Sequence, residues 1–118
     1  MKSELYSKML PFLGDEQKLF QRMAGQMDLW EECVLLFPGI EIIEEMEAAL
    51  QTGNDTALYG AVHRLKGNLA NFGFDSASEK AMALLAAIRE KDAEKVPYWY
   101  TELKEEYLQM IERIGEVK

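Results

Sequence analysis

Hydrophobic residues recur at intervals of three and four along most of the chain, which is the spacing of amphipathic α-helices. No stretch alternates apolar and polar residues for long enough to indicate a half-buried strand. Valine, isoleucine and threonine are sparse, whereas leucine, methionine, alanine and glutamate are abundant. The pattern therefore predicts an all-α protein.

Breaks in this periodicity divide the chain into helices over about 3–13, 16–37, 42–50, 55–72, 76–91 and 93–114. Gly25 is expected to weaken the second helix midway, and Pro38 marks a break or kink after it. Gly53 and Gly73 are predicted helix ends, and Asn54 or Asp55 a helix start. Further starts are expected at the capping box Ser76-x-x-Glu79 and at Asp92.

The connections between these helices are short, which favours antiparallel neighbours. We expect an antiparallel up-down four-helix bundle with one or two short extra helices at the N-terminus. A chain of 118 residues is one domain's worth, so the prediction is a single domain over 1–118.

Charge and hydropathy narrow the possible partners and location. The net charge is −8, and the 13 lysines and arginines are scattered, which disfavours nucleic acid. No apolar run approaches the ~20 residues of a membrane span, and the N-terminus does not resemble a signal peptide. We expect a cytoplasmic monomer with no membrane association. Met1 and the complete bundle indicate a stand-alone protein, although an excised domain would look the same.

The segment 55–72 carries the candidate chemistry. Its large apolar residues fall within about 40° of one line along the helix, which defines a core-facing seam of Leu58, Val62, Leu65, Leu69 and Phe72. His63 lies about 140° from that line, toward solvent or a partner. It is the only histidine, which excludes a multi-histidine metal site and a second imidazole as base.

Small residues and one lysine surround His63 on the helix. Gly60 and Gly67 each cost roughly 1 kcal/mol relative to alanine, and the seam gives no packing reason for them. They leave room for another protein to approach the imidazole, and Lys66 at i+3 can place an ammonium near an anion on the ring. Adjacent carboxylates such as Glu31-Glu32 diverge by about 100°, so no metal site is expected.

The eleven residues His63-Arg64-Leu65-Lys66-Gly67-Asn68-Leu69-Ala70-Asn71-Phe72-Gly73 closely resemble the signature of histidine-containing phosphotransfer (HPt) domains. That signature has leucine, lysine and glycine at the second, third and fourth positions after the histidine, and a glycine near the tenth. One departure is Asn68, which stands where serine or another small residue is usual.

The resemblance implies a phosphotransfer protein of a multistep His-Asp phosphorelay. His63 would accept a phosphoryl group on Nε2 from an aspartyl phosphate of a receiver domain and pass it to another receiver. Lys66 would stabilise the phosphate, and a docking and clearance surface would comprise Tyr59, Gly60, Gly67, Asn68, Ala70 and Asn71. Implied partners are response-regulator receiver domains, which supply Mg²⁺, and a hybrid sensor histidine kinase.

The chain has no glycine-rich phosphate loop or kinase signature, so we expect a phosphocarrier without an ATP site, not an enzyme. Two alternatives stay open. One is the phosphate-accepting domain of a chemotaxis-type histidine kinase, which often contains a Phe-Gly-Phe like Phe72-Gly73-Phe74. The other is a helical module that binds a receiver without accepting phosphate.

Overall fold

A computed structural model describes residues 3–118 and confirms the all-α prediction. The secondary structure of these residues consists of seven α-helices and one 3-10 helix, with no strand among them. In chain order the elements are α1 (Glu4–Met9), η1 (Leu10–Phe12), α2 (Glu16–Arg22), α3 (Met27–Leu35), α4 (Ile40–Gln51), α5 (Asp55–Asn71), α6 (Asp75–Glu90) and α7 (Lys95–Val117).

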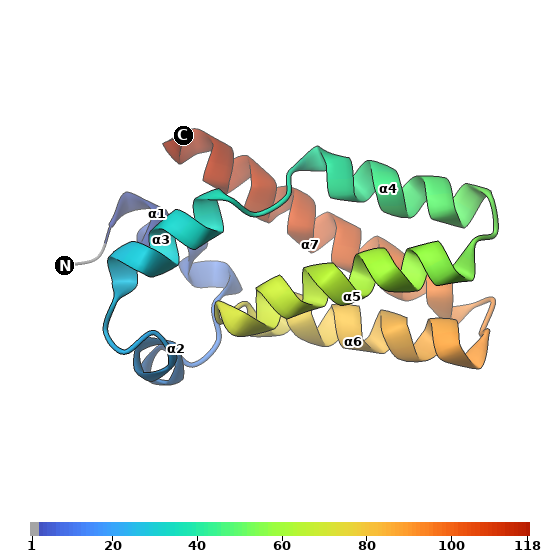
Figure 1. Ribbon diagram of the computed structural model, residues 1–118, viewed down its shortest axis with the longest axis horizontal. Helices are drawn as coiled ribbons and strands as arrows, with labels where there is room; N and C mark the ends of the chain where they lie inside the picture. The colour runs from blue at the N-terminus through green and yellow to red at the C-terminus, as the bar shows by residue number, and fades with distance from the viewer. Residues whose placement is uncertain (1–2) are drawn as a thin grey trace.

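The last four helices form the expected up-down bundle, in which each runs antiparallel to the one before it (Figure 1). α5 packs between α4 and α6, and α7 packs on α6 and contacts α4. The apolar faces meet in one core, whose largest fully buried side chains include Trp30, Phe74, Leu65, Leu84, Leu103 and Tyr107. Burial of these faces is the main source of stability in such a bundle.

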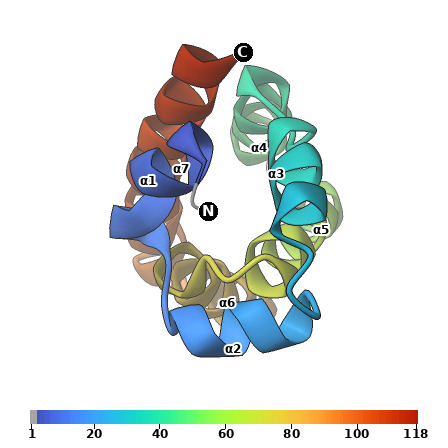
Figure 2. The ribbon, with the colours of Figure 1, turned by 90° about the vertical axis from the view of Figure 1, so that its left-hand side faces the viewer.

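The predicted single helix over 16–37 is wrong, because the chain turns sharply in its middle. α2 ends at Arg22 and α3 begins at Met27. Between them Ala24 and Gly25 take left-handed φ angles of 52° and 75°, which no α-helix contains. The break gives two short helices, α2 and α3, which together with α1 are arranged around one end of the bundle (Figure 2).

The two ends of α5 agree with the sequence prediction. The side chain of Asn54 accepts a hydrogen bond from the Ala57 backbone amide at 3.0 Å and caps the first turn. At the other end Gly73 has φ +85°, and the Phe74 amide donates to the Leu69 carbonyl at 2.9 Å. This is the 6→1 hydrogen bond typical of a Schellman ending, in which the glycine position takes a left-handed conformation.

The predicted capping box at Ser76 is wrong. α6 begins at Asp75, with Phe74 in the N-cap position and no side-chain cap. The Ser76 hydroxyl instead hydrogen-bonds to the Glu106 carboxylate of α7 at 2.9 Å. The serine therefore joins two bundle helices and does not start one.

Hydrogen-bond donors from the N-terminal part of the chain reach the backbone carbonyls at the C-terminal end of α5. The last carbonyls of a helix have no partner within it, and the helix dipole is negative there, so outside donors are needed. Three carbonyl oxygens receive them, as follows: Ala70 from the Arg22 guanidinium, Phe72 from Trp30 Nε1 at 2.9 Å, and Gly73 from the Gly14 amide at 2.9 Å. The short helices thus support the end of α5.

Trp30 is the largest fully buried side chain at this junction. It is fully buried, contacts the Tyr6 ring edge-on at a centroid distance of 5.5 Å, and lies 6.1 Å from the Phe74 ring. We expect Trp30→Ala to lower the free energy of unfolding by about 3–5 kcal/mol, because it leaves a large cavity and an unpaired carbonyl.

Urea denaturation followed by circular dichroism measures this effect. The control is Trp99→Ala, since Trp99 is the second tryptophan and is only half-buried. Equal losses in the two variants would contradict the conclusion that burial of Trp30 stabilises the contact between α3 and the bundle.

Candidate functional site

His63 lies near the middle of α5, and its side chain is exposed. The opposite side of the helix is buried, with Leu58 2% exposed and Val62, Leu65 and Leu69 fully buried. Phe72, the last residue of the predicted seam, is half-buried against the core. The helix therefore turns its only histidine away from the core, as the periodicity predicted.

The imidazole of His63 has no hydrogen-bond partner among residues 3–118. Its one ring contact within the described part of the chain is with Tyr59, one turn earlier, at a centroid distance of 6.2 Å and an interplanar angle of 16°. A ring nitrogen whose lone pair is neither buried nor engaged can attack an electrophile. The geometry therefore suits a nucleophilic histidine better than a structural one.

Lys66 follows one turn after His63 and lies about 60° around the helix axis from it. No carboxylate of residues 3–118 forms an ion pair with Lys66. The neighbouring Arg64, in contrast, is paired with Glu45 of α4. Lys66 consequently keeps its positive charge available for an anion that approaches His63.

Gly60 and Gly67 lie within about 60° of His63 around the axis, one on each side along the helix. A Cβ atom added at either position would meet no heavy atom within 4 Å. Neither glycine is therefore required by packing within the chain. Together they leave backbone uncovered beside the imidazole.

The other residues predicted for the docking surface lie at different angles around the axis of α5. Ala70 shares the histidine face, but its carbonyl is already covered by the Arg22 guanidinium. Asn71, the last residue of α5, is exposed and lies about 80° from His63. Asn68 lies about 140° from His63 and is half-buried, so the structure does not bring it together with the histidine.

Arg89, which the sequence did not suggest, approaches this surface from α6. Its Nε donates to the Tyr59 hydroxyl at 3.0 Å, and Nη2 donates to the same oxygen. Arg89 is separated from Tyr59 by 30 residues, and the register between α5 and α6 places them together. The signal available in sequence was a lone arginine in the last turn of the next helix.

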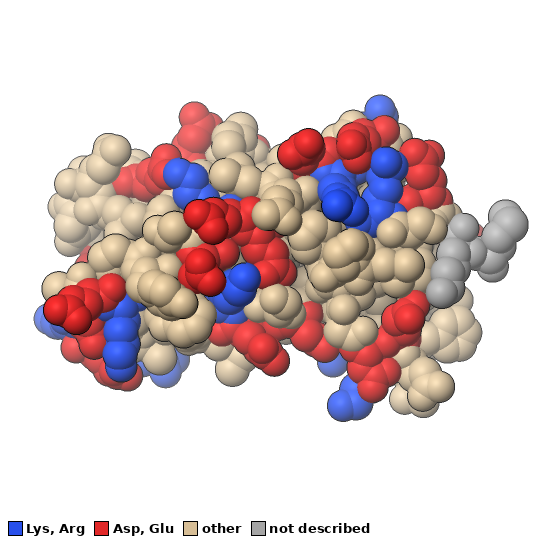
Figure 3. All heavy atoms as spheres, turned by 180° about the vertical axis from the view of Figure 1, so that it is seen from behind, with Lys and Arg blue, Asp and Glu red and all other residues tan. Residues whose placement is uncertain are grey.

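The charged side chains of the described residues form no metal-binding cluster: no group of three or more histidine, cysteine or acidic side chains within residues 3–118 could hold a metal ion. On the face opposite to that of Figure 1, basic side chains are interspersed with acidic ones (Figure 3). None of the helices in the described part combines the length and apolar character needed to cross a membrane.

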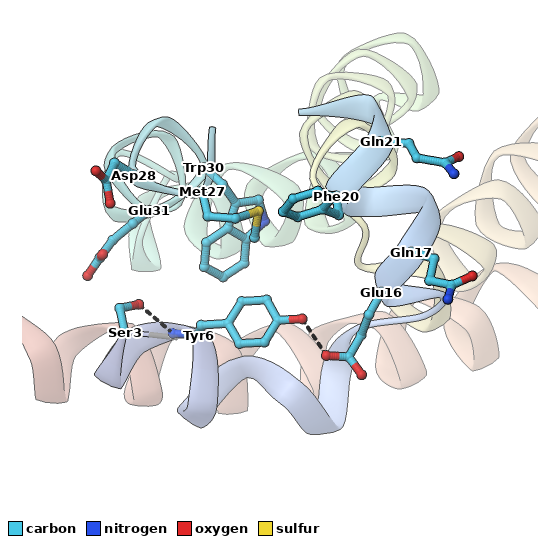
Figure 4. A pocket seen from close by; sticks show the side chains of 10 residues that line it. All are labelled: Ser3, Tyr6, Glu16, Gln17, Phe20, Gln21, Met27, Asp28, Trp30 and Glu31. Atoms are coloured by element: carbon cyan, nitrogen blue, oxygen red, sulfur yellow. Dashed lines mark hydrogen bonds between the residues drawn. The ribbon is translucent and has the colours of Figure 1, made fainter. Parts of the chain in front are cut away.

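A cavity of about 680 Å³ lies between α1, α2 and α3, away from His63. Figure 4 shows Tyr6 of α1, Phe20 of α2 and Trp30 of α3 lining it from three helices, and the Tyr6 hydroxyl donating to Glu16. Burial, and secondarily the Glu16 carboxylate, raises the pKa of Tyr6 to about 12, so this phenol stays protonated at neutral pH. No residue of α5 lines this cavity.

Comparison with known proteins gives one result. A family model described as the Hpt domain matches residues 39–115, which include α4, α5, α6 and most of α7. The short N-terminal helices lie outside the matched segment. No match to the chain was found among curated proteins or among solved structures.

Proposed function

Because the chain belongs to the Hpt domain family, we propose that it carries phosphoryl groups on His63 between receiver domains of a multistep His-Asp phosphorelay. Members of this family are phosphocarriers that interact with receiver domains and kinases. For this chain we propose that the donor is the aspartyl phosphate of a receiver domain, and that a hybrid sensor histidine kinase supplies this phosphate. The protein would act in the cytoplasm as a monomer.

The proposed transfer balances without a base on this chain. A lone pair of the His63 imidazole forms an N–P bond while the P–O bond to the receiver's aspartate breaks. The aspartate leaves as a carboxylate with the bonding pair, and the reverse exchange passes the phosphoryl group to a second receiver. Such transfer depends on positioning and charge neutralisation, and Mg²⁺ would come from the receiver.

One observation carries the proposal: the only histidine is exposed on a helix and has no hydrogen bond to residues 3–118. Its surroundings support the other roles. Lys66 would contact the phosphoryl oxygens, and Gly60 and Gly67 would let the receiver approach. Tyr59, Ala70 and Asn71 would border the docking surface, and Asn68, which lies on another face, would contribute least.

The decisive experiment is a transfer assay with purified receiver domains. Receivers phosphorylated in the presence of Mg²⁺ are mixed with the protein, which is then examined for acid-labile phosphate. Label on the native chain supports the proposal and identifies candidate partners. Absence of label with every receiver, when each receiver is shown to be phosphorylated, would indicate a docking module that accepts no phosphate.

Lys66 offers a test of charge neutralisation. We expect Lys66→Gln to slow phosphoryl transfer by about tenfold, because it removes a charge-assisted contact to the phosphoryl group. Stopped-flow or quenched-flow transfer at saturating receiver measures the rate. The control, Lys91→Gln, removes an exposed positive charge at the end of α6. Equal rates in the two variants would contradict the assigned role of Lys66.

A further inference from the structure

Tyr59 stands between His63 and a residue of a different helix. Its ring is nearly parallel to the imidazole, with an interplanar angle of 16° and a centroid distance of 6.2 Å. Long side chains on a helix lean toward its N-terminus, so the ring of residue 63 extends back over the turn that carries residue 59. The orientation of the imidazole therefore depends on where the tyrosine ring is held.

Arg89 holds the far end of that ring. Two nitrogens of the Arg89 guanidinium donate to the Tyr59 hydroxyl oxygen. Nε lies 3.0 Å from it, and Nη2 donates to the same oxygen. The central guanidinium carbon also lies 5.3 Å from the centroid of the Tyr59 ring. Two donors on one oxygen, combined with a cation–π contact, fix the ring more firmly than either contact alone.

Arg89 donates its hydrogen bonds to a tyrosine hydroxyl and not to a carboxylate. The protein has 21 acidic residues, yet Arg89 forms no ion pair with a carboxylate of residues 3–118. An arginine in the last turn of a helix also interacts favourably with the helix dipole. That general effect explains an arginine at this position but does not explain its two hydrogen bonds to Tyr59.

We propose that Arg89 is a positioning residue for phosphoryl transfer, which acts through the Tyr59 hydroxyl to hold the His63 imidazole ready for attack on phosphorus. This inference rests on the proposed function. Arg89 does not itself contact the reacting nitrogen. Its contribution is to restrict the ring that stacks on the nucleophile, so that fewer orientations are sampled before the N–P bond forms.

Four variants test the proposal: Arg89→Ala, Tyr59→Phe, the double variant, and the control Lys91→Asn. Tyr59→Phe keeps the aromatic ring and removes only the acceptor of both hydrogen bonds. Lys91→Asn removes a positive charge two residues beyond Arg89, and asparagine tolerates the left-handed φ of 54° at that position. The control thus separates loss of charge from loss of the contact.

We expect Arg89→Ala and Tyr59→Phe each to slow transfer at saturating receiver by about tenfold, since small misplacement of a nucleophile is costly. Receiver affinity should change by less than about twofold in Arg89→Ala, which alters no residue of the proposed docking surface. The double variant should be no slower than either single variant, because both remove the same interaction. Effects that multiply in the double variant, or a Lys91→Asn rate as low as that of Arg89→Ala, would overturn the proposal.

A second measurement uses no phosphate and no partner. Nuclear Overhauser contacts between the Tyr59 and His63 rings report how closely the two rings are held in the free protein. We expect these contacts to weaken in both Arg89→Ala and Tyr59→Phe and to persist in Lys91→Asn. If the native protein accepts no phosphate, the proposed function fails while this readout still decides the positioning role; unchanged ring contacts in Arg89→Ala would refute it.

Discussion

Replacement of His63 by glutamine is expected to reduce phosphate acceptance by at least about 10³-fold, because it removes the only imidazole and with it the proposed nucleophile. Glutamine is polar and similar in size, and the native ring is exposed without a hydrogen bond to residues 3–118. The free energy of unfolding should therefore change by less than about 0.5 kcal/mol. Receiver affinity should likewise be nearly preserved.

Three measurements on the same preparation separate these effects: labelled phosphate on the protein, urea denaturation, and calorimetric titration with a receiver. The native chain is the matched control in each. Loss of several kcal/mol of stability would mean that His63 contributes to the core, and retained labelling would mean that the phosphate resides on another residue. Either result would remove the basis of the proposed mechanism.

Replacement of Gly67 by leucine should impair receiver-dependent transfer by about 10²-fold while the bundle stays folded. A bulky side chain one turn from His63 would hold a docking partner away from the imidazole, and displacement of about 1 Å can cost this much in rate. Within the chain the new Cβ atom would meet nothing within 4 Å. Because leucine is the better helix former, the variant should be more stable by up to about 1 kcal/mol.

Gly115→Leu provides the matched control, since Gly115 is also a helical glycine with open space around it, but on α7. It should gain similar stability and transfer phosphate at the native rate. Phosphorylation by phosphoramidate, a small donor that transfers its phosphoryl group with loss of ammonia, should remain rapid in both variants. Native receiver-dependent transfer in Gly67→Leu would refute the clearance role of this glycine.

The sequence was sufficient to predict α5, the helix that carries His63, because the residues that set its ends and its buried face are local. The cap at Asn54 is a side chain bonded three residues onward, and the ending at Gly73 needs a left-handed residue that glycine adopts without strain. The buried seam follows from helical spacing alone. These three signals placed His63 on the exposed face without knowledge of any other helix.

The same reasoning failed where tertiary contacts decide the outcome. Leu19, Met23 and Met27 keep a helical spacing across the turn at 24–25, so periodicity could not reveal the break. Ala24 in this turn adopts a positive φ angle, which an alanine in a sequence does not predict. Ser76 has the sequence of a cap but bonds to Glu106 of α7, a partner 30 residues away.

In the candidate site, too, some residue positions follow from one helix and others depend on packing between helices. His63, Lys66 and the two glycines lie on one helix, and their relative positions follow from its pitch. Arg89 reaches Tyr59 only through the packing of α6 against α5, and Arg22 reaches Ala70 only because α2 folds over the end of α5. A single sequence does not predict how α6 aligns with α5 or where α2 packs against the end of α5.

The hydrogen bonds at the C-terminal end of α5 have a practical consequence for anyone who shortens this chain. All three donors precede residue 39, where the family match begins. A fragment trimmed to the match would retain His63, the proposed phosphorylation site, but would lose all three donors, including the Trp30 side chain. The segment that matches the family model is thus shorter than the unit that should be expressed, and mutations among the first 38 residues belong in any screen for variants that impair the proposed phosphoryl transfer.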